Sequence, residues 1–306
     1  MRWQKLGLVA RCDESRAWSR SHVMVPTPFL ASDGTLRIYY TSLDEQGRGR
    51  PGYLELDPED PIQVTYQTKE PLLDLGIPGC FDDSGVVVTS ALEEPGGRVI
   101  LYYVGFELLT TVRYRLLTGI AISDDGGRSF VRYSETPALE RLPDELAFRG
   151  GPYVLSDSGH YRMWYAAGSG WTEIDGKSMP VYELRTLVSD DPLRWDGGGQ
   201  ACLELGSDEH GFGRPYVVRR RAGWEMYYSI RRRSLGAYRL GFARSDDGLE
   251  WTRSDNELNL DVSSDGWDSE AIMYAAVVDL PGGTYCFYNG RDFGREGVGV
   301  AKLVTA

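Results

Sequence analysis

Met226-Tyr227-Tyr228 is one of five copies of a triplet in which a hydrophobic residue and an aromatic residue precede a tyrosine. The other copies are Ile38-Tyr39-Tyr40, Leu101-Tyr102-Tyr103, Met163-Trp164-Tyr165 and Cys286-Phe287-Tyr288. In chain order, the first residues of the five copies are 63, 62, 63 and 60 positions apart. A near-constant period of this size indicates a repeat architecture. Each triplet lies in a run of β-branched and aromatic residues, which favour strands. A run that is apolar on both sides of the alternation is typical of a strand covered on both faces.

The fourth copy shows the whole repeating unit. We expect a first strand at 215–218, the triplet strand at 224–230, a third strand at 240–244 and an outer strand around Trp251. Asp-Gly pairs between apolar runs, such as Asp247-Gly248, are hairpin signals because glycine takes the backbone angles that the turn requires. The fifth unit lacks an outer strand, and we expect the segment around 3–9 to supply it. That pairing would join both ends of the protein in one sheet and remove free sheet edges.

Composition narrows the class of protein. The chain has 306 residues, with 33 basic and 45 acidic side chains and a formal charge of −12, which argues against nucleic-acid binding. Its four cysteines are widely spread without CxxC spacing, so a disulfide framework or zinc site is not expected. The N-terminal apolar run is too short for a signal peptide, and no segment has the length of a membrane span. We therefore expect a single domain over residues 1–306, located in the cytoplasm, without metal, cofactor, nucleic-acid or membrane partner.

The repeating units resemble the five-bladed β-propeller glycoside hydrolase and phosphorylase superfamily, which includes arabinanases, invertases and mannosyl-glycoside phosphorylases. The resemblance rests on the aromatic-Tyr second strands, the Ser-Asp-Asp-Gly turns and the closing run Gly266-Trp267-Asp268-Ser269-Glu270. Ser123, Asp125, Gly127 and Phe130 also fit the Asp-box of sialidase-type propellers, a turn motif. For a divergent member, the resemblance implies an all-β, five-bladed β-propeller with four-stranded antiparallel blades, the last closed by the N-terminal strand. It does not by itself fix the function.

In such propellers the beginning of each first strand opens into the central funnel. The residues at that place are Ser21-His22, Asp82-Asp83, Arg149, Glu209-His210 with Arg214, and Asp268 with Glu270. Polar or charged residues thus occur in all five units, as a polar, sugar-like ligand requires. We interpret Arg149 and Arg214 as corresponding residues of neighbouring units.

Two carboxylates on either side of the scissile bond carry out most glycoside hydrolysis. The candidate pair is Asp83, or its neighbour Asp82, with Glu270, where Glu270 would be the general acid and Asp83 the base or stabiliser. The first unit has Ser21-His22 where the arabinanase and invertase groups place an essential aspartate, so His22 is a candidate acid–base group. Alternatively, these acids cap turns or form salt bridges.

Five further residues are candidates for substrate binding: Arg149, Arg214, Asp268, His210 and Trp171. The planar fork of arginine suits a carboxylate or a phosphate, and the tryptophan ring suits the apolar face of a sugar. The basic run Arg231-Arg232-Arg233 is either an anion-contacting loop or a solvated surface. It lies in one of three long insertions, at 105–118, 168–183 and 229–239, whose length is typical of functional loops.

We expect a carbohydrate-active enzyme, namely a glycoside hydrolase, transglycosylase or phosphorylase, that acts on a small soluble glycan or glycoconjugate. Two alternatives stay open. One is an enzyme of glycan or natural-product biosynthesis that acts on an anionic sugar, and the other is a non-catalytic sugar-binding propeller. Convergence of Asp83 and Glu270 on a pocket would favour the first function, and convergence of the arginines would favour the second.

Overall fold

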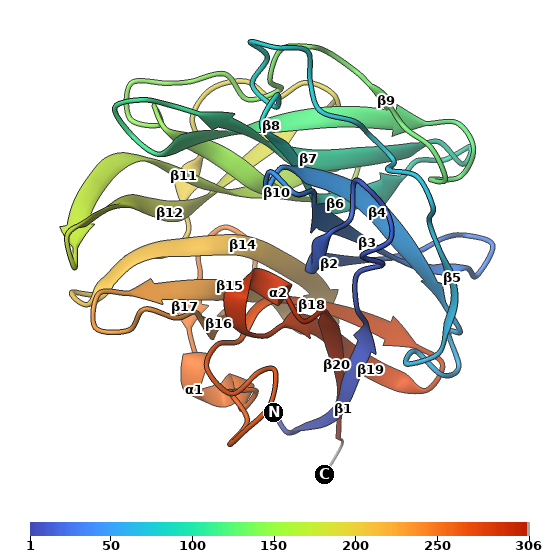
Figure 1. Cartoon of the computed structure of the whole chain (residues 1–306). Coiled ribbons are helices and arrows are strands. Elements are labelled where there is room, and N and C mark those ends of the chain that lie inside the picture. The colour runs from blue at the N-terminus through green and yellow to red at the C-terminus, as the bar shows by residue number, and fades with distance from the viewer. Residues whose placement is uncertain (305–306) are drawn as a thin grey trace.

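Antiparallel strands make up almost all of the regular structure, and they are arranged as a propeller-like set of sheets (Figure 1). The computed structural model describes residues 1–304. Within that range there are two helices of four residues each, α1 (Asp255–Leu258) and α2 (Arg291–Gly294). No helix of the described range is long and apolar enough to cross a membrane.

In each of the first four repeating units, four strands follow one another and pair antiparallel with their neighbours. The first unit contains β2 (Ser21–Leu30), β3 (Leu36–Leu43), β4 (Gly49–Leu56) and β5 (Val64–Gln67). The second contains β6 (Gly85–Glu93), β7 (Val99–Leu108), β8 (Tyr114–Ser123) and β9 (Val131–Arg132). The third contains β10 (Phe148–Asp157), β11 (His160–Ile174), β12 (Lys177–Ser189) and β13 (Gln200–Ala201). The fourth contains β14 (Glu209–Arg220), β15 (Gly223–Arg232), β16 (Arg239–Ser245) and β17 (Thr252–Arg253).

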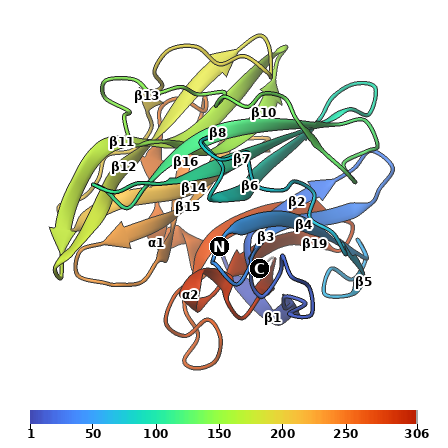
Figure 2. The same cartoon turned by 45° about the horizontal axis from the view of Figure 1, so that its top comes forward.

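The last sheet combines the two ends of the protein. Its strand order is β1 (Trp3–Ala10), β20 (Val298–Leu303), β19 (Gly283–Asn289) and β18 (Met273–Leu280). β1 pairs antiparallel with β20, with Trp3 opposite Leu303, and Figures 1 and 2 show both termini at this sheet. Short parallel contacts link the other units, from β4 to β6, from β8 to β10 and from β12 to β14. Residues 1–304 form no closed sheet, so the count of five blades and the closed ring stay predictions.

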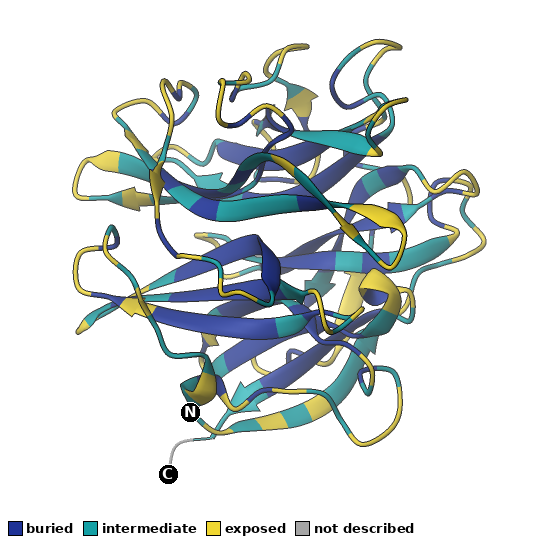
Figure 3. Ribbon diagram, turned by 90° about the vertical axis from the view of Figure 1, so that its left-hand side faces the viewer, coloured by how far each residue is buried: buried dark blue, intermediate teal, exposed yellow. Residues whose placement is uncertain are grey.

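The triplets form the interior of the sheets, as their pattern predicted. Every residue of the five triplets is at most 1% exposed. In Figure 3 the middle strands are buried while the connecting loops are exposed. Double coverage explains why these strands are continuously apolar, since each sheet packs against another on both faces.

The final tyrosine of four triplets donates a hydrogen bond to a carboxylate that is itself paired with a cation. The hydroxyl–carboxylate distances are 3.0 Å for Tyr103–Asp82, 2.9 Å for Tyr165–Glu145, 2.6 Å for Tyr228–Asp255 and 3.0 Å for Tyr288–Asp268. The matching cations are Arg132, Arg149 with Arg185, Arg253 and Lys5. In the first unit Gln67 takes the place of the acid and donates to the Tyr40 hydroxyl. This repeated tyrosine–carboxylate–cation contact satisfies a polar group that each apolar strand would otherwise bury.

A β-bulge interrupts each first strand before the residue that faces the centre of the triplet. Four residues at this position have positive φ: Val25 (55°), Gly151 (67°), Arg214 (48°) and Tyr274 (58°). Such angles are costly for residues other than glycine and cluster where a strand must redirect a side chain. The bulges therefore fix which side chains leave the sheets near the centre of the molecule.

Candidate functional site

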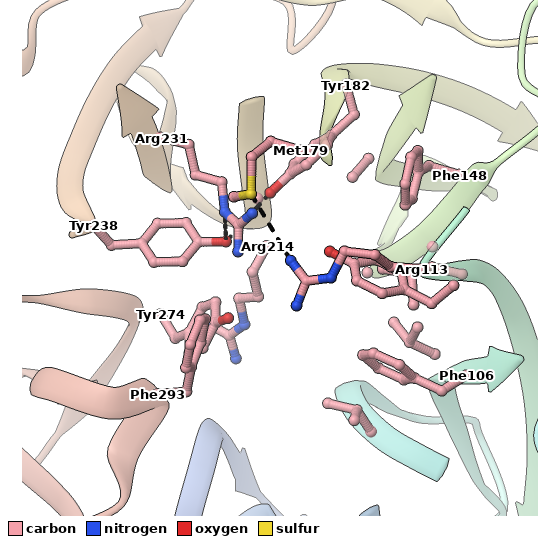
Figure 4. Close-up of a pocket in the computed structure, with 18 of the residues that line it drawn as sticks. Phe106, Arg113, Phe148, Met179, Tyr182, Arg214, Arg231, Tyr238, Tyr274 and Phe293 are labelled. Atoms are coloured by element: carbon pink, nitrogen blue, oxygen red, sulfur yellow. Dashed lines mark hydrogen bonds between the residues drawn. The ribbon is translucent and has the colours of Figure 1, made fainter. Parts of the chain in front are cut away.

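A pocket of about 700 Å³ lies where the first strands begin. Residues from β2, β6, β10, β14 and β18 all line it, and so do residues of all three long insertions. The prediction that the beginnings of the first strands share one cavity is thus supported by the geometry. Figure 4 shows side chains from different units extending into this space.

The bulges decide which residue of each first strand reaches the pocket. All four bulge residues with positive φ line it, and Arg214 is the charged one. The interpretation that Arg149 corresponds to Arg214 is wrong, because Gly151 occupies the bulge position in β10 that Arg214 occupies in β14. Arg149 lies opposite Ala167, and the equivalent pair in the next unit is Phe212 opposite Ile230. Arg149 is buried inside its own sheet, where it pairs with Glu145 at 2.5 Å. A shift of two residues along the strand separates the two arginines.

The charge of the pocket is opposite to that of the whole protein. Its lining contains six cationic side chains: Arg113, Lys177, Arg214, Arg231, Arg232 and Arg233. Asp175, in the turn between β11 and β12, is the one carboxylate among the lining residues of the described range. None of the six cations forms an ion pair with another residue in the range 1–304, although most arginines elsewhere do. Each long insertion contributes at least one of these cations.

Arg231 lies among tyrosine side chains on one wall of the pocket (Figure 4). Its Nε donates to the Tyr238 hydroxyl at 2.5 Å, and the Tyr182 hydroxyl lies 3.2 Å from that of Tyr238. Its Nη1 is buried without a hydrogen-bond partner in the described range. Burial opposes the charge of Arg231, but the neighbouring hydroxyls of Tyr182 and Tyr238 raise its pKa above the usual value. This guanidinium is therefore charged and keeps N–H groups without an acceptor, so it can donate hydrogen bonds to an anionic ligand.

Arg214 forms the floor of the pocket. Its guanidinium donates to the carbonyls of Ala275 at 2.8 Å and Pro26 at 2.6 Å, which belong to β18 and β2. The residue is 4% exposed, its Nε has no partner among residues 1–304, and burial lowers its pKa to about 10. Arg214 thus stays charged at neutral pH while its contacts join three units around the centre. An uncompensated buried charge of this kind favours a nearby anion.

His210 provides a neutral base at the same pocket. Its Nδ1 lies 2.9 Å from the Pro180 carbonyl oxygen, so that nitrogen carries the proton and Nε2 is the acceptor. Burial lowers the pKa of His210, with a contribution from the charges of Arg231 and Arg233, although the bond to Pro180 opposes the shift. The imidazole is therefore uncharged at neutral pH, as a proton acceptor must be.

The predicted catalytic carboxylates do not line this pocket. Asp83 accepts hydrogen bonds from the Gly79 amide at 2.9 Å and the Ser84 hydroxyl at 2.8 Å, as a turn cap does. Glu270 has a side chain that is 68% exposed and pairs with Arg291 at 3.2 Å. Asp82 and Asp268 are buried acids of the tyrosine–carboxylate–cation contacts. The structure therefore does not bring Asp83 and Glu270 together across this cavity.

Four other candidates have different positions. His210 and Arg214 line the pocket, as described above. His22 lies outside the lining, with Nδ1 2.7 Å from the Ser21 hydroxyl, and burial lowers its pKa. Trp171 packs behind the wall, with ring centroids 5.5 Å from Phe148 and 5.8 Å from Tyr114. Within residues 1–304, His, Cys, Asp and Glu side chains form no group of three that could hold a metal ion.

The pocket also has residues that the sequence analysis did not single out. These are Arg113, Lys177 and an aromatic lining that includes Phe106, Tyr114, Phe148, Tyr238, Tyr274 and Phe293. One signal in the sequence pointed toward them, because each of the three long insertions carries basic and aromatic residues. That these insertions meet at one cavity depends on the arrangement of the units, which the sequence pattern does not specify.

Sequence comparison identifies a relative of similar length. The protein is 36% identical over 308 residues to "Uncharacterized protein Rv1502" of Mycobacterium tuberculosis strain H37Rv, and the match covers 99% of both proteins. No family model matches the sequence.

Three solved structures described as glycoside or glycosyl hydrolases share this fold. One, "Glycoside hydrolase", has a TM-score of 0.72 and 17% identity and covers 99% of this protein and 92% of its own length. A glycosyl hydrolase from Bacteroides ovatus has a TM-score of 0.68 and 17% identity and covers 93% and 84%. A thermostable family-43 glycoside hydrolase has a TM-score of 0.67 and 14% identity and covers 97% and 94%. The resemblance to the propeller glycoside hydrolases is thus confirmed for the fold, at 14–17% sequence identity.

Proposed function

This protein belongs to the same family as the uncharacterized Mycobacterium tuberculosis protein Rv1502, and we propose that it is a carbohydrate-active protein whose pocket binds an anionic sugar. One observation carries this proposal: six cations without an ion-pair partner in the range 1–304 and a single carboxylate line the pocket of a protein with a net charge of −12. The fold shared with glycoside hydrolases supports a carbohydrate as the ligand, and the aromatic walls suit the apolar face of a sugar ring. We propose with it a single domain of five blades closed by β1, supported by the pairing of β1 with β20.

Isothermal titration calorimetry tests the proposal with three sugars of the same ring: glucose, glucuronate and glucose 1-phosphate. At least one anionic sugar should bind about tenfold more tightly than glucose, because a charge-assisted hydrogen bond contributes about 1.5–3 kcal/mol. Arg231→Met should remove this preference. Arg221→Met is the matched control, since Arg221 is exposed and lies outside the pocket. Equal binding of the neutral and charged sugars would contradict the proposal.

Glycoside hydrolysis is the second candidate function, and the structural likeness to glycoside hydrolases favours it. Asp83 and Glu270 stay the proposed catalytic pair, with Asp82 and His22 as further candidates. A screen of nitrophenyl glycosides, with and without added phosphate, tests this function. Turnover that disappears in Asp83→Asn and Glu270→Gln would support the pair, and turnover that persists in both variants would exclude it.

A further inference from the structure

The number of cations in the pocket exceeds what one sugar carboxylate can neutralise. With six cations, one carboxylate and a neutral His210, the lining carries a formal charge of +5. A uronic acid brings a single negative charge, whereas a phosphoryl group brings about −1.5 to −2 at neutral pH and three acceptor oxygens. Uncompensated charge near the floor of a cavity is costly, so a ligand of higher charge stabilises this arrangement more.

Two guanidinium groups approach the same space from opposite walls. Figure 4 shows Arg113 and Arg231 extending toward the middle of the cavity, with Arg214 beneath them. The hydrogen bond that Arg113 makes within the pocket goes to the Met179 sulfur at 3.8 Å. A thioether is a weak acceptor, so an oxyanion would replace it readily. Arg231 keeps an Nη1 without a partner in the described range, beside the hydroxyl groups of Tyr182 and Tyr238.

The three arginines Arg231, Arg113 and Arg214 would contribute to the binding of an oxyanion in different ways. Arg231 is fixed by Tyr238 and the centroid of that ring lies 4.8 Å from its guanidinium carbon, so its orientation is set before a ligand arrives. Arg113 is exposed at the end of the β7–β8 hairpin and can move toward the ligand. Arg214 donates its Nη protons to carbonyls and a threonine hydroxyl, so it acts through its charge. Arginine forks on two sides match the several oxygens of a phosphoryl group.

Aromatic side chains occupy the walls on both sides of this position. Tyr238 contacts Phe293 at a centroid distance of 5.9 Å. Figure 4 shows Phe106 and Phe148 on the other side of the cavity. A ring attached to the bound anion would lie between these walls. The apolar faces of a sugar or a nucleobase suit such surfaces.

We infer that the anion recognised in this pocket is a phosphoryl group, and that the ligand is a sugar phosphate or a sugar diphosphate conjugate. This inference rests on the proposed function and names its substrate class. Arg113 and Arg231 contact the phosphoryl oxygens, Arg214 stabilises the charge from below, and the aromatic walls hold the attached ring.

Calorimetric titrations with inorganic phosphate, glucose 1-phosphate, UDP-glucose and glucuronate at constant ionic strength test the inference. At about pH 7.5 a phosphorylated probe should bind at least about tenfold more tightly than glucuronate, because it carries the higher charge. Comparison of glucose 1-phosphate with UDP-glucose then distinguishes a monoester from a diphosphate. Arg113→Met should weaken the binding of the phosphorylated probe about tenfold, the size of one charge-assisted hydrogen bond. This variant lies at an exposed hairpin end, so it tests the site even if Arg231→Met fails to fold.

The pH dependence of a monoester provides a second measurement. The second ionisation of a phosphate monoester has a pKa of about 6, so lowering the pH from about 7.5 to about 5 should weaken its binding about tenfold. The cations that face the ligand are Arg113, Lys177, Arg214 and Arg231–Arg233. The hydroxyls of Tyr114, Tyr182 and Tyr274, whose pKa burial raises, also face it and stay protonated. Asp175 and His210 also face the pocket, so glucuronate, whose own charge is constant over this range, serves as the reference for changes in the protein.

The outcomes separate the inference from the proposed function. If glucuronate binds as tightly as every phosphorylated probe, the phosphoryl inference is overturned and the anionic-sugar function stands. If neither glucuronate nor any phosphorylated probe binds more tightly than glucose, both are overturned. If glucose 1-phosphate loses no affinity at the lower pH relative to glucuronate, and UDP-glucose binds no more tightly than glucuronate, the inference fails.

Discussion

The hydroxyl of Tyr103 illustrates how single residues hold the sheets together. It donates to Asp82, a fully buried acid that also pairs with Arg132 at 2.9 Å. The other Asp82 oxygen has no partner among the described residues. The acid therefore depends on two contacts, and losing either leaves a buried charge poorly satisfied.

Tyr103→Phe should lower the free energy of unfolding by about 1–3 kcal/mol, the cost of leaving a buried acceptor without its donor. Urea denaturation followed by circular dichroism measures this change. Tyr133→Phe serves as the control, since Tyr133 is 48% exposed and should lose nothing measurable. An unchanged midpoint in Tyr103→Phe would show that the hydroxyl does not support the sheet.

The carboxylate of Asp125 should make the stability of the protein depend on pH. Burial acts against its charge, but hydrogen bonds from Ser123, Ser129 and the Arg128 amide lower its pKa to about 2. Because the folded pKa lies below the unfolded one, the stabilisation is present above the unfolded pKa and is lost as the pH falls toward about 2.

Asp125→Asn should therefore destabilise the protein at neutral pH, and the difference from the wild type should shrink below about pH 4. Urea unfolding at a series of pH values follows this difference. A difference that stays constant down to the lowest pH at which the protein folds would refute the charge-based explanation.

At the scale of elements, β1 completes the last sheet with both backbone and side-chain contacts. Lys5 on this strand lies 2.6 Å from Asp268, whose side chain is 3% exposed. Lys5→Met should cost about 3 kcal/mol of stability, the lower end for breaking a buried ion pair. Thermal and urea unfolding measure the loss. Lys69→Met, at an exposed lysine outside any ion pair of residues 1–304, should be neutral. Equal stability of the two variants would mean that β1 contributes only its backbone.

The first strands show which part of the site the sequence could predict. Their apolar character and spacing located each first strand, although β14 begins at Glu209 and not at the expected residue 215. The pocket lies at the leading ends of these strands.

The side chains that enter the pocket could be assigned only in part. His210 and Arg214 line it as expected, but a bulge changes the alternation within each strand. Phe148 and Gly150 line the cavity while Arg149 between them does not. The alternation of side chains along a strand does not reveal a bulge in the sequence unless a glycine occupies the bulge, as Gly151 does.

At the scale of the whole molecule, the uneven charge distribution governs ligand binding. The repeat, and with it the fold, was visible in the sequence because the triplets recur at constant spacing. The sequence did not show that three cationic insertions meet at one pocket, because that depends on how the units are arranged in space.

Raising the salt concentration from about 0.05 M to about 0.5 M should weaken the binding of an anionic sugar several-fold, since exposed charges are screened over this range. Arg233→Ser should reduce the salt dependence, because Arg233 lies at the exposed rim of the pocket. Titrations in series of sodium chloride concentrations test this. Salt-independent affinity would mean that the rim cations do not contribute.

The most direct test of the cationic pocket is a crystal structure of the protein with glucose 1-phosphate. We expect the phosphoryl group between the guanidinium groups of Arg113 and Arg231, with the sugar ring against the aromatic walls. A sugar bound instead beside Asp83 or Glu270, with the cationic pocket empty, would contradict this expectation.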